Sequence, residues 1–164
     1  MKLQELKNDI KGRLVTALTA APALSVVLIS AVYQLMLGSP YLIYYGNPLI
    51  MGYMTFVAIA GSLALSLIYR RTFTPVLMSV LFALCFTSNL IFILNGTTDV
   101  LADGFFEMIL LIFYLPSWSY MSVAASISFD FSLPLLIITA ILSLICLVVG
   151  IAVFVLNKKE KRKE

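Results

Sequence analysis

The sequence predicts an all-α integral membrane protein with four transmembrane helices. Three observations support this class: 62% of the 164 residues are hydrophobic, the mean hydropathy is +1.05, and only 12% of the residues are charged. A soluble domain of this size is about half apolar. The few charges cluster near the two ends and in short connecting segments, as is typical of a chain that crosses a bilayer several times.

The first thirteen residues (1–13) are predicted to form an amphipathic helix on the cytoplasmic membrane surface. Leu3, Leu6 and Ile10 recur at helical spacing, and charged residues fill the other faces. Such a helix lies in the headgroup region, where its basic side chains attract anionic lipid. The alternative is a solvated helical extension of the first span.

A single membrane domain, residues 14–156, follows this helix. Four segments within it each contain 20 or more residues without a formal charge, which is enough to cross a hydrocarbon core of about 30 Å. Pro22 interrupts the first segment and is expected to kink it. A basic cytoplasmic tail, residues 157–164, follows the last span. The predicted spans are residues 14–37, 49–69, 73–94 and 133–156.

The segment 105–131 decides how often the chain crosses. If it stays on one side, all eleven Lys and Arg residues lie on one face with both termini; if it crosses, they divide six against five. The positive-inside rule favours the first arrangement. A crossing would also bring Pro116 and Trp118 to the bilayer centre, where backbone groups freed by proline lack partners and tryptophan is disfavoured.

We therefore expect 105–131 to form an outer broken helical pair, interfacial or re-entrant, with its break at Pro116. Both termini are then cytoplasmic, and the protein is predicted to be a multi-pass protein of the cell membrane. Five spans are the alternative.

Polar residues gather on the predicted outer face. Asp99, Asp103 and Glu107 are spaced by four, so on a helix they would share one face and repel each other. With two amides and one further acid they form a candidate outer polar cluster, which is either a weak cation or proton site or a solvated surface. The amides alternatively bond between helices. The cluster consists of Gln34, Asn89, Asp99, Asp103, Glu107 and Asp130.

Two further features fall on the predicted outer side. The triplet that begins at Asn95 is an N-glycosylation sequon. Aromatic residues there are typical of an interfacial belt, and the alternative is a docking surface for a lipid, a quinone-like ligand or another subunit. This outer aromatic surface consists of Tyr41, Tyr44, Tyr45 and Trp118.

The sequence favours a non-catalytic function. Histidine is absent, and Cys85 and Cys146 each lie alone in an apolar stretch, so we predict no metal site and no cofactor. The predicted spans carry no deep acidic or basic residue of the kind that proton pumps and ion-coupled carriers use. We expect an accessory or scaffold subunit of a larger membrane complex for transport or electron transfer. Its partners would be the lipid bilayer and other membrane proteins, not nucleic acid.

Two alternative functions use the outer face. The first is a small transporter or channel with an outer acidic vestibule. The second is a membrane hydrolase that uses Asp99, Asp103 or Asp130. In size, span number and outer aspartates the chain resembles the lipoprotein signal peptidases in architecture only, because TTDVLADG and SISFDF lack the flanking Asn and Arg patterns of that family.

Overall fold

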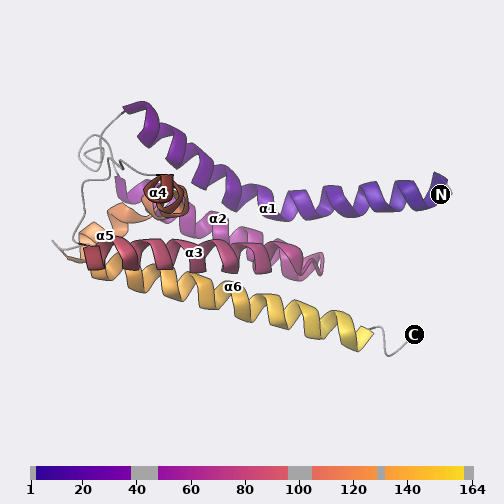
Figure 1. Ribbon diagram of the computed structural model, residues 1–164. Helices are drawn as coiled ribbons and strands as arrows, with labels where there is room; N and C mark the ends of the chain where they lie inside the picture. Colours follow the sequence, from indigo (N-terminus) through magenta and orange to yellow (C-terminus); the bar gives the residue numbers. More distant parts are fainter. Residues whose placement is uncertain (1–2, 38–47, 96–104, 129–131, 161–164) are drawn as a thin grey trace.

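The computed structural model describes residues 3–37, 48–95, 105–128 and 132–160. These residues form six helices and no strand, which confirms the all-α class. In Figure 1, α3 and α6 lie side by side along most of their length, α1 and α2 pack beside them, and α4 is seen end-on. The helices are α1 (Leu3–Leu37), α2 (Pro48–Ile68), α3 (Phe73–Asn95), α4 (Phe105–Trp118), α5 (Met121–Ile127) and α6 (Ser132–Glu160).

Three helices of the described chain are long and apolar enough to cross a membrane. By length and composition these are Ile10–Ile29 within α1, Phe73–Leu94 within α3, and α6. α2 coincides with the predicted second span, but its described apolar stretch, Gly52–Ile68, is shorter. The membrane-protein class is therefore supported by three helices, and the count of four spans stays a prediction.

α1 is continuous from Leu3 to Leu37, so no helix end separates residues 1–13 from the first apolar segment. Whether residues 1–13 lie on the membrane surface or extend the first span into solvent stays a prediction. Figure 1 shows α1 bending near its middle, and Pro22 lies inside the helix. Proline lacks the N–H that would bond one turn back. The neighbouring N–H of Ala23 donates to Ser62 Oγ on α2 at 3.1 Å, which ties the bend to α2.

α3 and α6 approach each other closely through small and hydroxyl side chains. Ser79 Oγ donates to the Ser143 carbonyl at 3.1 Å, and Ser143 Oγ donates to the Ser79 carbonyl at 3.0 Å. One turn nearer the start of α3, a Cβ added at the buried Gly150 would lie 3.3 Å from Val76 Cγ2. Small residues at such contacts let helix backbones pack tightly in a membrane.

The turn between α2 and α3 is joined to the end of α6. Arg70 adopts a left-handed conformation with φ 53°, and the Arg71 N–H donates to the Ser66 carbonyl at 2.9 Å, which caps α2. The Arg70 guanidinium pairs with the Glu160 carboxylate, and Asn157 Nδ2 donates to the Arg70 carbonyl at 3.0 Å. An exposed ion pair contributes little by itself, but together these bonds set where α6 meets the turn.

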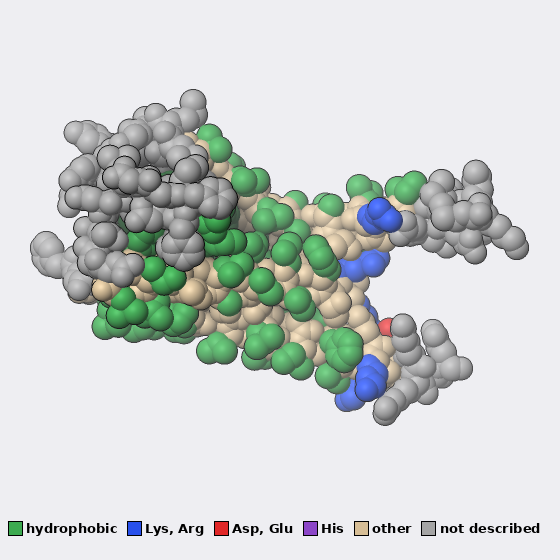
Figure 2. All heavy atoms as spheres, in the orientation of Figure 1, with side chains coloured by type: hydrophobic (Ala, Val, Ile, Leu, Met, Phe, Trp, Pro, Cys, Tyr) green, Lys and Arg blue, Asp and Glu red, His purple; other side chains and the backbone are tan. Residues whose placement is uncertain are grey.

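The start of α1 and the end of α6 lie at the same end of the molecule (Figure 1). The described Lys and Arg side chains also gather at this end, while hydrophobic side chains cover the length of the helices (Figure 2). The described cations are Lys11, Arg13, Arg70, Arg71, Lys158 and Lys159.

The segment 105–131 contains two separate short helices. α4 has 14 residues and α5 has 7, so at 1.5 Å per residue they are about 21 and 10 Å long, short of a core of about 30 Å. Since α4 is seen end-on while α3 and α6 are seen from the side, α4 runs across the bundle (Figure 1).

The helix break lies later than the sequence predicts. Pro116 is inside α4, and the chain turns at Ser119 and Tyr120. One proline near a helix end removes only one N–H, so α4 continues past it. The Ser119 N–H and hydroxyl both reach the Pro116 carbonyl, at 3.4 and 2.8 Å, and this local bonding competes with the next helical turn.

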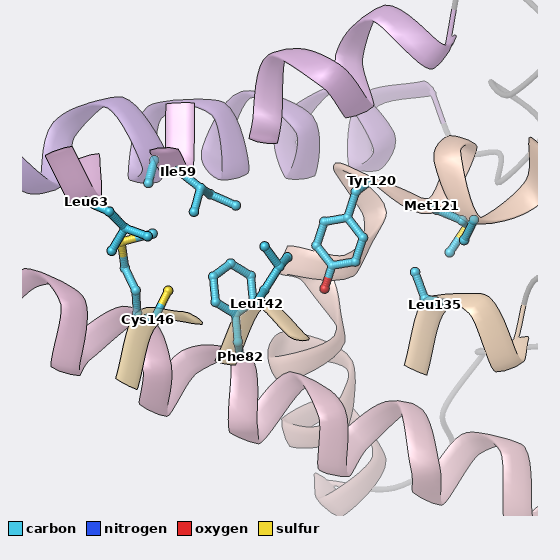
Figure 3. Packing of buried hydrophobic residues seen from close by; sticks show 11 residues of the cluster. Ile59, Leu63, Phe82, Tyr120, Met121, Leu135, Leu142 and Cys146 are labelled. Atoms are coloured by element: carbon cyan, nitrogen blue, oxygen red, sulfur yellow. The ribbon is translucent and has the colours of Figure 1, made fainter. Parts of the chain in front are cut away.

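Buried hydrophobic residues form a core between these helices (Figure 3). Tyr120 is fully buried and projects from the α4–α5 turn into this core. Its ring centroid lies 6.1 Å from that of Phe56 on α2 and 6.4 Å from that of Phe82 on α3. The break between α4 and α5 is therefore packed against the other helices.

A test of this packing compares two glycines of α2. A Cβ added at Gly52 would overlap Val123 Cγ2 on α5, whereas a Cβ at Gly61 would meet nothing within 4 Å. We expect Gly52→Ala to lower the free energy of unfolding by about 1–3 kcal/mol, and Gly61→Ala to leave it unchanged or raised by up to about 1 kcal/mol. Thermal unfolding in detergent, followed by Trp118 fluorescence, measures both changes. Equal stability of the two variants would contradict the contact between α2 and α5, and Val123→Ala should restore stability to Gly52→Ala.

Candidate functional site

A buried polar cluster lies where α3, α6 and the α4–α5 turn meet. It consists of Cys85 and Asn89 on α3, Tyr120 in the turn, and Thr139 on α6, and the exposed fraction of each is 2% or less. Cys85 and Asn89 are four residues apart, so they share one face of α3. Thr139 on α6 lies within hydrogen-bond distance of Asn89, and Tyr120 projects from the turn between α4 and α5 (Figure 3).

Bond distances determine which group donates in this polar cluster. Thr139 Oγ1 lies 2.7 Å from the Leu135 carbonyl, which only accepts, so Thr139 donates its one proton there. Its oxygen then accepts from Tyr120 Oη at 2.9 Å and from Asn89 Nδ2 at 3.4 Å. Because the Tyr120 proton is used, the Cys85 thiol, 3.7 Å away, is the donor to Tyr120 Oη.

Asn89 is the weakest member of the polar cluster. In the part of the chain that the structure describes, its Nδ2 makes only long contacts, at 3.4 Å to Thr139 Oγ1 and 3.7 Å to Cys85 Sγ, and its buried Oδ1 has no hydrogen-bond partner. A buried acceptor without a partner costs about 1–3 kcal/mol. Asn89 therefore brings an energetic cost that offsets the bond it makes to α6.

Side-chain hydrogen bonds, some of them within the polar cluster, fix the α4–α5 turn to three helices. Besides the bond from Tyr120 to Thr139 on α6, Thr55 Oγ1 on α2 donates to the Ser119 carbonyl at 3.3 Å. The Cys85 contact adds α3. These hydrogen bonds can hold the helices in one geometry. Asn89 Oδ1, which has no partner among the described residues, could accept a hydrogen bond from one further polar group.

α4 also docks on α3 through aromatic contacts. The Tyr114 ring lies edge-on to that of Phe92 on α3, with 5.3 Å between centroids, and edge-on to that of Trp118 at 6.3 Å. Trp118, the described member of the predicted outer aromatic surface, is half-buried. The other three, Tyr41, Tyr44 and Tyr45, lie outside the described residues.

Of the predicted outer polar cluster, the structure describes only the side chain of Asn89. It is buried and bonds to α6, which is one of the two roles considered for the amides. Gln34 belongs to α1, Glu107 to α4 and Asn95 to the end of α3, and their side chains lie outside the description. Whether the acids converge stays a prediction, because three of the four also lie outside the described residues: Asp99, Asp103 and Asp130.

Sequence reasoning missed Tyr120 and Thr139 as members of the polar cluster that contains Asn89. A signal was present, because Thr139 is a hydroxyl residue within an aliphatic run and Tyr120 follows a Pro-Ser-Trp-Ser segment. Neither signal indicates which helix faces meet, since Asn89 and Thr139 are separated by 50 residues.

The described residues contain no group of three or more His, Cys, Asp or Glu that could hold a metal ion. No family model matches the chain, and no curated protein or solved structure matches it either. Its function is therefore inferred from the geometry of its own residues.

The bond pattern predicts unequal effects for two isosteric or nearly isosteric changes. Thr139→Val removes the acceptor of the Tyr120 hydroxyl, so we expect a loss of about 1–3 kcal/mol in the free energy of unfolding. Asn89→Leu removes only long bonds and an unpaired oxygen, so we expect a change of less than about 1 kcal/mol. Unfolding in bicelles, monitored by the single tryptophan, gives both values. A larger loss in Asn89→Leu than in Thr139→Val would show that Oδ1 has a partner of its own.

Proposed function

We propose that this chain is a non-catalytic membrane protein that acts as an accessory or scaffold subunit of a larger membrane complex. Its support is the way polar side chains are used: Thr19 Oγ1 and Thr74 Oγ1, 2.6 Å apart, join α1 to α3, and Ser79 and Ser143 join α3 to α6. The polar cluster adds the α4–α5 turn. Bonds of this kind hold α1, α3, α6 and the α4–α5 turn together as a platform of defined shape.

One observation supports a protein partner for this platform. α6 carries two stripes of residues at spacings of three and four. The inner stripe, from Leu135 to Val153, is buried, and the outer stripe consists of large apolar residues with exposed fractions between 42% and 63%. Spacing of this kind lets a helix pack along another helix. The outer stripe consists of Leu133, Ile137, Ile141, Leu144, Val148, Ile151 and Val155.

The proposal includes a topology of four spans with both termini in the cytoplasm. Its support is that the start of α1, the end of α6 and the described cations lie at one end (Figures 1 and 2), as the positive-inside rule requires for a cytoplasmic end. α2 is then the fourth span, and α4 and α5 form the outer pair.

Fusion reporters test this topology. A green fluorescent protein fused after Glu164 should fluoresce, and alkaline phosphatase fused at the same place should be inactive, because the tail stays in the cytoplasm. Alkaline phosphatase inserted into the segment 96–104 should be active. An active phosphatase after Glu164 would contradict four spans and favour five.

A bulky substitution in the outer stripe tests the subunit role. Val148→Phe keeps the apolar character but adds volume where a partner helix would pack, so we expect the fraction of chain in a larger complex to fall about tenfold, the effect of about 1.4 kcal/mol. Val57→Phe on α2 is the control, since Val57 is 68% exposed and lies outside the stripe. Native gels of the tagged protein in mild detergent give this fraction. Wild-type protein that migrates as the free 18.1 kDa chain, or equal behaviour of both variants, would contradict the proposal.

A further inference from the structure

An open groove runs between α1 and the start of α3, at the end of the molecule where the cations gather. Its volume is about 720 Å³, and its lining includes Arg13 on α1 and Arg71 just before α3. Figure 2 shows Lys and Arg side chains around the hollow at this end of the molecule. The groove is thus basic at one end.

Within the described part of the chain, Arg71 is packed against α1 and has no acidic partner. Its guanidinium lies against the backbone of Gly12, where an added Cβ would be 3.5 Å from Nη2 and 3.7 Å from Nη1. No described residue accepts a hydrogen bond from its buried Nε. Among the residues that the structure describes, no carboxylate pairs with Arg71, whereas its neighbour Arg70 pairs with Glu160. A planar guanidinium held this way suits a phosphate, which accepts two parallel N–H bonds.

The rest of the groove is mostly apolar and has the length of about one bilayer leaflet. Ala17 and Leu24 line it from α1, and Phe73 and Leu77 line it from α3. From Gly12 to Leu24 the helix rises about 18 Å at 1.5 Å per residue, against about 15 Å for half of the hydrocarbon core. The small side chain of Ala17 leaves space beside the α1 backbone.

We propose that this groove binds one anionic phospholipid of the surrounding bilayer. The phosphate accepts hydrogen bonds from Arg71, with Arg13 beside it, and one acyl chain lies along the apolar wall. A basic end joined to an apolar wall of leaflet length matches both parts of such a lipid. This is one defined lipid site, whereas basic termini attract anionic lipid diffusely. It requires only that α1 and α3 lie in a bilayer, so the proposal does not depend on the subunit role.

Native mass spectrometry of the full-length protein in a neutral detergent tests the site. Dioleoylphosphatidylglycerol is titrated against dioleoylphosphatidylcholine, which has the same acyl chains and no net charge. We expect one phosphatidylglycerol to bind more tightly than any further copy. Arg71→Gln should weaken this first binding by about tenfold, since bonds to a charged group contribute more than neutral ones. Arg71→Lys keeps the charge but loses the paired geometry, so it should recover only part of the affinity.

Matched variants separate the groove from its surroundings. Lys158→Gln removes the same charge from an exposed position on α6 and should change the first binding by less than about twofold, as for a weakly contributing surface charge. Ala17→Leu fills the groove without changing charge and should weaken binding, whereas Ala152→Leu, at an exposed position outside the groove, should not.

Three results would overturn the proposal. Equal weakening by Arg71→Gln and Lys158→Gln would mean a diffuse attraction. If Ala17→Leu and Ala152→Leu bind the lipid equally well, the acyl chain does not lie in the groove. Displacement of the lipid by inorganic phosphate at a similar concentration would mean that the arginines bind phosphate alone.

Discussion

A helix that ends away from water leaves N–H and C=O groups that need partners within the protein, and the buried α4–α5 turn depends on how the chain meets this constraint. Its own side chains supply the partners. The Ser119 hydroxyl returns to the Pro116 carbonyl, Thr55 donates to the Ser119 carbonyl, and Tyr120 carries its hydroxyl to Thr139. With these bonds made, α4 and α5 fold onto α2, α3 and α6 instead of continuing as one helix.

The same constraint shapes the long helices. At the α1 bend, the Ala23 N–H bonds to Ser62, and between α3 and α6 two serines exchange bonds with each other's carbonyls. Each such bond contributes only about 0.6 kcal/mol in a membrane protein, so close packing must supply much of the remaining stability. Glycine at position 150 permits that approach. Helices held by many small contacts present a defined outer surface, as the proposed accessory or scaffold role requires.

Two adjacent arginines at the α2–α3 turn have different surroundings. Arg70, in its left-handed conformation, pairs with Glu160 and joins the turn to α6. Arg71 lies against Gly12 of α1 and faces the groove. One cation is therefore paired within the fold, and the next lies at the groove where we propose that an anion binds. The basic end that the positive-inside rule identifies is chemically uneven, with a specific lipid site proposed within it.

The sequence by itself determined the all-α membrane class, the long apolar segments, the proline in α1 and the broken nature of 105–131. Hydropathy and charge distribution are local properties, so they can be read without knowing which helices touch. The sequence placed the break three residues early, at Pro116, because the position of a turn depends on which backbone groups find partners.

Only the tertiary structure decided that Tyr120, Thr139 and Asn89 meet, and that Arg71 lies against Gly12. These residues come from separate elements, and helical periodicity states which residues share a face but not which faces pack together. Convergence of the outer acids remains a prediction for the same reason, since it depends on how the ends of several helices are arranged.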